Sequence, residues 1–252
     1  MYTNIPLGPL TLPTGPILAL IAVWIGLDAM GRYGKRWRLS IDDLWNLSLF
    51  ALTAGLIVAR LWNVVQFWPV YVDQPLMIFS VRPGGFEFWP GVIAAGVVGY
   101  AYLIWRSLDP VTVAAALAFG LVAAGSILSA SAYLTGAVVG VATELPWGVN
   151  YFGKAVHAVG LYQAVGLLIL LVVLWVWPER TRPGRVVLLA GLGYGLLRLI
   201  TDGFLADPAT ISGFRVGQVV GLVVALICAW GLGRGAQSVH VHDLVDGAGK
   251  TK

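Results

Sequence analysis

The chain has 252 residues, of which 58% are hydrophobic and only 11% are charged, and its formal net charge is +4. Soluble domains carry about a quarter charged residues, so this composition, with a mean hydropathy of +0.83, excludes a water-soluble globule. The single cysteine, Cys228, excludes an intramolecular disulfide. In such a chain the cationic excess indicates loop charge bias and not nucleic-acid binding, so the sequence predicts an all-α, polytopic membrane protein.

Seven segments are long and apolar enough, or nearly so, to cross a bilayer, which takes about 20 residues per helix. They cover residues 15–30, 44–65, 90–105, 110–128, 157–177, 186–204 and 216–230. The stretch 129–141 is apolar but short, and it is interpreted as a re-entrant or interfacial piece packed within the protein, because irregular backbone is not tolerated against lipid. We expect one seven-helix domain over residues 1–234 and a polar, frayed cytoplasmic tail over 235–252.

Lysine and arginine residues gather on one side of these spans. Because cytoplasmic loops carry the excess of such residues, the N-terminus is expected outside the membrane and the C-terminus inside, which requires an odd number of spans. No internal repeat is found, so a transporter built from inverted halves gains no support. On the predicted cytoplasmic side lie Arg32, Lys35, Arg36, Arg38, Arg106, Arg180, Arg182, Arg185, Arg234, Lys250 and Lys252, and on the other side Arg82, Lys154 and Arg215.

Two outer segments, residues 67–90 and 129–156, are too long to be simple turns. The first is rich in aromatic residues, at a density that suits the headgroup layer of a membrane. Two interpretations remain open for both segments. They either anchor the protein at the membrane interface or roof a lipid-facing cavity.

Two arginines interrupt the apolar spans, and each would cost at least about 2.5–3.5 kcal/mol unpaired near the bilayer centre. Arg198 and Asp202 lie four residues apart on one helical face and can pair directly. One interpretation is therefore a buried ion pair together with an Arg60 side chain that reaches outward. The other is a phosphate clamp made by Arg60 and Arg198, because the guanidinium fork matches phosphate oxygens. A phospholipid headgroup is the phosphate most available at that depth.

Few other side chains offer chemistry. His157 opens the fifth span and Gln218 lies early in the seventh, both toward the outer side. The other two histidines lie in the C-terminal tail, so neither a Ser-His-Asp set, a zinc spacing nor a phosphate loop can be assembled. The sequence thus predicts no metal site and no cofactor.

Several short motifs, in order and spacing, resemble the prolipoprotein diacylglyceryl transferase family over about residues 8–230. That bacterial membrane enzyme moves a diacylglyceryl group from phosphatidylglycerol onto the cysteine thiol of a lipoprotein precursor, and it has seven spans in the same orientation. The matching motifs are Gly8-Pro-Leu10; Ala59-Arg-Leu61 for G-A-R-L; Gly84-Gly-Phe-Glu-Phe88 with Gly91 for G-G-L-S-F-H-G-G; Gly136, Gly140 and Thr143-Glu-Leu-Pro-Trp-Gly-Val149 for N-G-E-x-x-G and T-D-L-P-W-G-V; His157 with Leu161-Tyr162 for R-H-P-S-Q-L-Y; Arg198, Asp202 and Asp207-Pro208 for R-x-x-x-E-x-x-R-x-P-D; and Gly217-Gln218 for S-M-G-Q.

The resemblance implies a bacterial cytoplasmic membrane, a phosphatidylglycerol-like phospholipid as partner, and headgroup binding by Arg60, Arg198, Asp202 and Gln218. The departures fall where the family's catalytic residues would lie. A shift of the alignment by one helical turn still finds no Arg or Glu in residues 126–142. The family's motif histidine becomes Trp89, which we expect to fill the histidine's space; the arginine becomes Ser129, the asparagine Ala132, the glutamate Ala137, an early tyrosine Thr14 and the second arginine of the sixth-span motif Leu205.

Two functional hypotheses follow. The first is a non-catalytic relative that keeps a phospholipid-binding bundle and serves as a lipid-holding or accessory subunit of a membrane complex with protein partners. Loss of the base and of a charge clamp argues for it, because thiol attack needs a thiolate and departure of glycerol phosphate needs cations. The second is an active diacylglyceryl transferase with a rewired site that uses His157 as base. A transporter or channel is a third class, which no polar stripe supports.

Overall fold

A computed structural model describes residues 4–7, 10–80, 83–151, 153–176 and 182–249 of the chain. Seven of its helices are long and apolar enough to span a membrane within this described part. The chain is thus a polytopic all-α membrane protein, as the composition predicts. The spanning helices are α1 (Thr14–Gly34), α2 (Ile41–Gln66), α4 (Phe88–Trp105), α5 (Pro110–Thr135), α6 (Val159–Val176), α7 (Pro183–Thr201) and α8 (Val216–Gly249).

Short elements fill the connections at one end of the bundle. The chain begins with a hairpin, β1 (Asn4–Leu7) and β2 (Leu10–Pro13). The segment between α2 and α4 holds α3 (Trp68–Asp73) and the 3₁₀ turns η2 (Pro75–Phe79) and η3 (Pro83–Gly85). Two more hairpins follow α5 and α7, namely β3 (Val149–Tyr151) with β4 (Lys154–Val156), and β5 (Thr210–Ile211) with β6 (Phe214–Arg215). This end carries the N-terminus and is called the outer end below.

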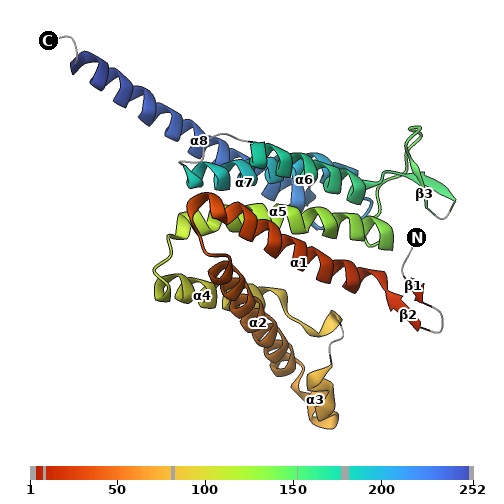
Figure 1. Ribbon diagram of the computed structural model, residues 1–252. Coiled ribbons are helices and arrows are strands. Elements are labelled where there is room, and N and C mark those ends of the chain that lie inside the picture. The colour runs from red at the N-terminus through yellow and green to blue at the C-terminus, as the bar shows by residue number, and fades with distance from the viewer. Residues whose placement is uncertain (1–3, 8–9, 81–82, 152, 177–181, 250–252) are drawn as a thin grey trace.

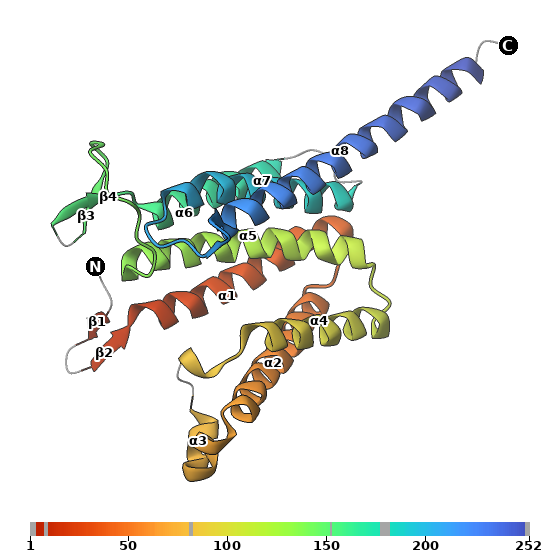
Figure 2. The same ribbon diagram turned by 180° about the vertical axis from the view of Figure 1, so that it is seen from behind.

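The helices form three layers (Figure 1). Helices α6, α7 and α8 lie together, α1 and α5 form the middle, and α2 with α4 forms a hairpin on the far side, as the reverse view in Figure 2 also shows. Helix α5 packs against α1, α6 and α7 and is the centre of the bundle. Close packing of three helix pairs depends on glycines that face one another, because a side chain there would meet the partner's backbone. These pairs are Gly26 with Gly120, Gly55 with Gly91, and Gly195 with Gly221.

Contacts at the inner end join helices that the charge pattern predicts to share a side. The guanidinium of Arg36 donates to the Trp175 carbonyl at 2.8 Å and lies over the ring of Tyr33. Arg106 pairs with Asp43 at 2.8 Å. The ends of α1, α4 and α6 and the start of α2 are thereby fixed at one end of the bundle. That this end is cytoplasmic stays a prediction from the positive-inside rule.

Two expectations about local structure are wrong. Residues 129–135 are not a re-entrant piece but the last turns of α5, which ends where Gly136 adopts a left-handed φ of 70°. A glycine at this position is a common helix stop, and the small residues before it are compatible with a helix. The tail after Gly235 is not irregular either, because α8 continues to Gly249 with no proline to interrupt it.

Candidate functional site

A buried ion pair lies at the outer end of α7. Nη2 of Arg198 is 2.8 Å from Oδ2 of Asp202, and the carboxylate side chain is only 2% exposed. Its other oxygen accepts a hydrogen bond from Nε2 of Gln163 at 3.4 Å, and the same amide donates to Thr201 at 3.2 Å. The pair predicted from the four-residue spacing is therefore confirmed. It is linked to α6 through Gln163, a residue that no sequence motif singles out.

Two glycines of α8 make room for this pair. A Cβ at Gly217 would collide with the Asp202 carboxylate, so only glycine fits while the ion pair is formed. One turn further along, a Cβ at Gly221 would lie 2.7 Å from the carbonyl oxygen of Gly195. The backbones of α7 and α8 are therefore in close contact directly beside the ion pair.

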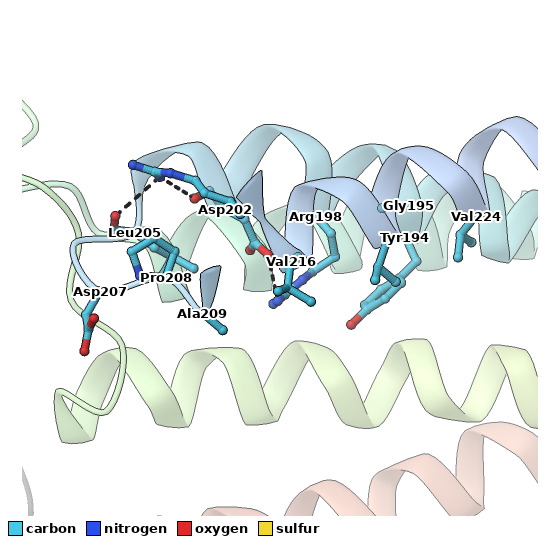
Figure 3. A pocket seen from close by; sticks show the side chains of 14 residues that line it. Tyr194, Gly195, Arg198, Asp202, Leu205, Asp207, Pro208, Ala209, Val216 and Val224 are labelled. Atoms are coloured by element: carbon cyan, nitrogen blue, oxygen red, sulfur yellow. Dashed lines mark hydrogen bonds and ion pairs between the residues drawn. The ribbon is translucent and has the colours of Figure 1, made fainter. Parts of the chain in front are cut away.

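A cavity of about 350 Å³ opens next to the pair, between α7, α8 and the loop that joins them. Figure 3 shows how its lining changes along its length. Asp207 and Pro208 lie at the loop end, Arg198 lies in the middle, and Val224 lies at the end nearer the centre of the span. The lining therefore runs from polar to apolar in the direction in which a lipid headgroup gives way to its acyl chains.

Arg215 also lines this cavity, and sequence reasoning counted it only as an outer-side cation. Its Nη1 donates to the carbonyl oxygens of Asp202 at 2.8 Å, Gly203 at 2.6 Å and Leu205 at 3.5 Å. It holds the turn η4 (Asp202–Phe204) that ends α7. The available signal was its position two residues before Gly217.

Arg60 lies elsewhere. Its guanidinium donates to the carbonyl oxygens of Ile78 at 2.9 Å, Gly85 at 2.7 Å and also Met77, all in the segment between α2 and α4. The ring of Tyr71 lies 5.3 Å from its Cζ. Arg60, Tyr71, Met77 and Gly85 line a second cavity of about 500 Å³ that shares no lining residue with the first. The structure therefore does not bring Arg60 and Arg198 into one clamp.

The other two predicted polar residues lie near the first cavity without lining it. Nδ1 of His157 is 3.4 Å from the hydroxyl of Tyr162, and its ring lies against Phe204 at 4.7 Å. Gln218 donates through Nε2 to the Leu199 carbonyl at 3.1 Å and so bonds to the backbone of α7. Neither side chain is among those that line the Arg198 cavity.

The positions at which the sequence analysis predicts departures from the family pattern are scattered. Trp89 does not fill a vacated site, because it is 71% exposed at the start of α4 and contacts Phe88. Ser129 and Ala132 lie in the last turns of α5, where the Ser129 backbone packs closely against α6, and Ala137 is exposed in the loop that follows. Thr14 is 4% exposed at the start of α1, and its hydroxyl has no hydrogen-bond partner among the described residues.

Comparison with known proteins identifies the family. The family described as prolipoprotein diacylglyceryl transferase matches residues 4–233. A phosphatidylglycerol–prolipoprotein diacylglyceryl transferase of Clostridioides difficile is 28% identical over 82% of this chain and 84% of its own length. Proteins of the same name from Finegoldia magna and Thermosynechococcus vestitus are 27% and 26% identical, over 83% and 92% of this chain and 86% and 91% of their own lengths. This multi-pass bacterial membrane protein therefore belongs to the prolipoprotein diacylglyceryl transferase family.

Proposed function

We propose that this protein binds a phosphatidylglycerol-like phospholipid in the Arg198 cavity without catalysing diacylglyceryl transfer, and that it serves as a lipid-holding or accessory subunit of a membrane complex. The observation that carries the proposal is the lining of that cavity. It offers the guanidinium of Arg198 midway along its length and the apolar side chain of Val224 at the end nearer the centre of the span, but no histidine or cysteine among its lining residues. A volume of about 350 Å³ falls within the usual range for a small-ligand site.

The electrostatics support phosphate binding. Arg198 lies in the outer half of its helix, and its side chain is 34% exposed although its partner Asp202 is buried. A guanidinium has five N–H donors, so a pair with one carboxylate leaves donors for a second anion. Val220 and Val224 form an apolar part of the lining, on the side of the cavity nearer the centre of the span. An acyl chain can pack against these side chains without leaving a polar group unpaired.

The chemistry of thiol transfer favours a non-catalytic role. A thiol attacks as its thiolate, so a base or a cationic field must face it. At the positions that the family pattern gives to its histidine, arginine and glutamate, this chain has Trp89, Ser129 and Ala137. His157 is the nearest substitute base, but its ring packs on Phe204 outside the cavity.

An active transferase with a rewired site is the alternative, and the names of the relatives favour it. It requires His157 to accept the proton of the incoming thiol. Replacement of His157 by Ala would then abolish lipid-dependent transfer. A measured turnover that is unchanged in that variant dismisses His157 as the base.

Two measurements on the protein in lipid nanodiscs test the proposal. Native mass spectrometry should detect bound phosphatidylglycerol in the wild type and in Arg32→Met, a control that removes an exposed arginine of the inner end, but not in Arg198→Met. Incubation with phosphatidylglycerol and a lipoprotein-precursor peptide that contains the acceptor cysteine should give no lipidated peptide. Lipid retention by Arg198→Met would overturn the binding site, and turnover at the rate of a related transferase would overturn the non-catalytic role. Stoichiometric chains that co-purify from native membranes would support the subunit role.

A further inference from the structure

Two residues that line the Arg198 cavity, Leu205 and Arg215, differ from the family pattern quoted above. The pattern R-x-x-x-E-x-x-R places an arginine where this chain has Leu205, and the pattern S-M-G-Q places a serine where it has Arg215. The two residues are ten positions apart in sequence, yet both line the same cavity. Nη1 of Arg215 lies 3.5 Å from the carbonyl oxygen of Leu205. The cavity therefore has a leucine where the motif would place an arginine, and an arginine beside that position.

The guanidinium of Arg215 is held in place by hydrogen bonds that leave some of its N–H donors free. All three of its hydrogen bonds to the described residues leave from Nη1 and end on the carbonyls of η4 and Leu205. Nε and Nη2 have no hydrogen-bond partner there, so three of the five N–H donors of the guanidinium stay available. Carbonyl partners fix the group in place without neutralising its charge. Such a group is prepared to receive an anion.

The charge balance of the cavity depends on this residue. Its lining contains Arg198 and Arg215 as cations, and Asp202 and Asp207 as carboxylates. Without Arg215 the lining would hold one cation against two carboxylates, which would repel a phosphate. With it the charges balance, and the buried carboxylate of Asp202 is already paired with Arg198.

We infer that Arg215 is a binding residue that has taken over the role of the arginine missing at position 205, and that Arg198 and Arg215 together bind the phosphate of the ligand. This inference rests on the proposed binding of a phospholipid. The clamp is then made by two residues of one cavity and replaces the pair of Arg60 and Arg198 that the sequence suggested. The shared chemistry is a phosphate group, which a lipid headgroup or a soluble phosphate can supply.

A purely structural role is the competing explanation, because carbonyls at a helix C-terminus attract a cation wherever it comes from. An exchange of positions separates the two roles. Arg215→Ser removes both the carbonyl contacts and the charge. The double variant Arg215→Ser with Leu205→Arg returns a guanidinium to the cavity but not the bonds from β6 to the end of α7. Lys154→Ser serves as control, because it removes an exposed outer-side cation from another hairpin.

The experiment measures affinity for phosphatidylglycerol by titration into detergent-solubilised full-length protein, with thermal unfolding of each variant in parallel. Arg215→Ser should weaken binding about tenfold or more, Lys154→Ser should bind as the wild type does, and the double variant should regain affinity while its unfolding temperature stays lowered. Wild-type affinity in Arg215→Ser, or no recovery in the double variant, would overturn the inference.

Competition with inorganic phosphate identifies the source of the ligand. If only a high phosphate concentration displaces the lipid, the ligand is the lipid headgroup. If free phosphate binds preferentially and its binding also requires Arg215, the same two arginines bind a soluble ligand. A wild type that binds neither probe refutes the proposed function and the clamp together. A wild type that binds while Arg215→Ser binds equally well refutes the clamp alone.

Discussion

Replacement of Asp202 by Asn should destabilise the bundle more than most single substitutions at a polar position. The carboxylate is 2% exposed and lies 2.8 Å from Arg198. The amide keeps the shape and a bond to Gln163 but leaves the guanidinium without its counter-charge. Breaking a buried ion pair costs 3–5 kcal/mol, and because a third of the Arg198 side chain reaches the cavity we expect about 2–3 kcal/mol.

Removal of both charges should cost far less. In Arg198→Met with Asp202→Leu, no charge is left unpaired inside the bundle, and such apolar replacements of a buried pair are often neutral. We expect the stability of the double variant to lie within about 1 kcal/mol of the wild type. Phosphate binding should nevertheless disappear, because the cavity has lost a cation. Stability and ligand binding would thereby be separated in one protein.

Reversible unfolding in mixed detergent micelles, followed by circular dichroism, measures these free energies. The single variants Arg198→Met and Asp202→Leu, together with their double variant, complete a thermodynamic cycle that isolates the pair. An Asp202→Asn variant as stable as the wild type would refute the argument. A double variant that is less stable than both single variants would refute it too, because the instability would then not come from an unpaired charge.

Other regions give further tests. Arg60→Leu should raise hydrogen exchange in the outer segment before α4 and leave lipid retention unchanged, since its guanidinium holds that segment through carbonyls; unchanged exchange would contradict this anchoring. Gly221→Leu should force α7 and α8 apart at a cost of about 1–3 kcal/mol and reduce lipid retention, whereas Gly233→Leu, where a Cβ meets nothing within 4 Å, should have no effect in the same assays; equal effects would refute the packing argument. The pKa of Asp109 is lowered below the ordinary 3.8 by hydrogen bonds from Thr112, chiefly from its side chain and also from its backbone N–H. The contribution of this carboxylate to stability is therefore fully present above pH 3.8 and is lost as the pH falls through the lowered pKa. Thermal scans of Asp109→Asn should show a flatter acid limb than the wild type, and identical limbs would exclude this carboxylate as the titrating group.

Local chemistry was readable from the sequence. Hydropathy counts predict the seven spans because membrane insertion depends on the composition of about 20 consecutive residues. The ion pair of Arg198 and Asp202 was predictable too, because two residues four positions apart on a helix lie on one face. The end of α5 was missed because small apolar residues suit a helix and a re-entrant loop equally. Its stop depends on the conformation of Gly136.

The tertiary structure decided which residues lie together in the candidate site. Arg60 and Arg198 both lie in the outer halves of their helices, but α2 packs with α4 and α7 packs with α8, so the two side chains reach different cavities. Trp89 faces outward because Gly91 occupies the face that packs on α2. Arg215 joins the Arg198 cavity because a hairpin folds back onto the end of α7. The sequence by itself determined the spans and the pair on one helix, since both depend on residues that are neighbours in the chain. Which charges share a cavity was decided by the rotation and the packing partners of each helix. These follow from close packing between segments that are far apart in the chain.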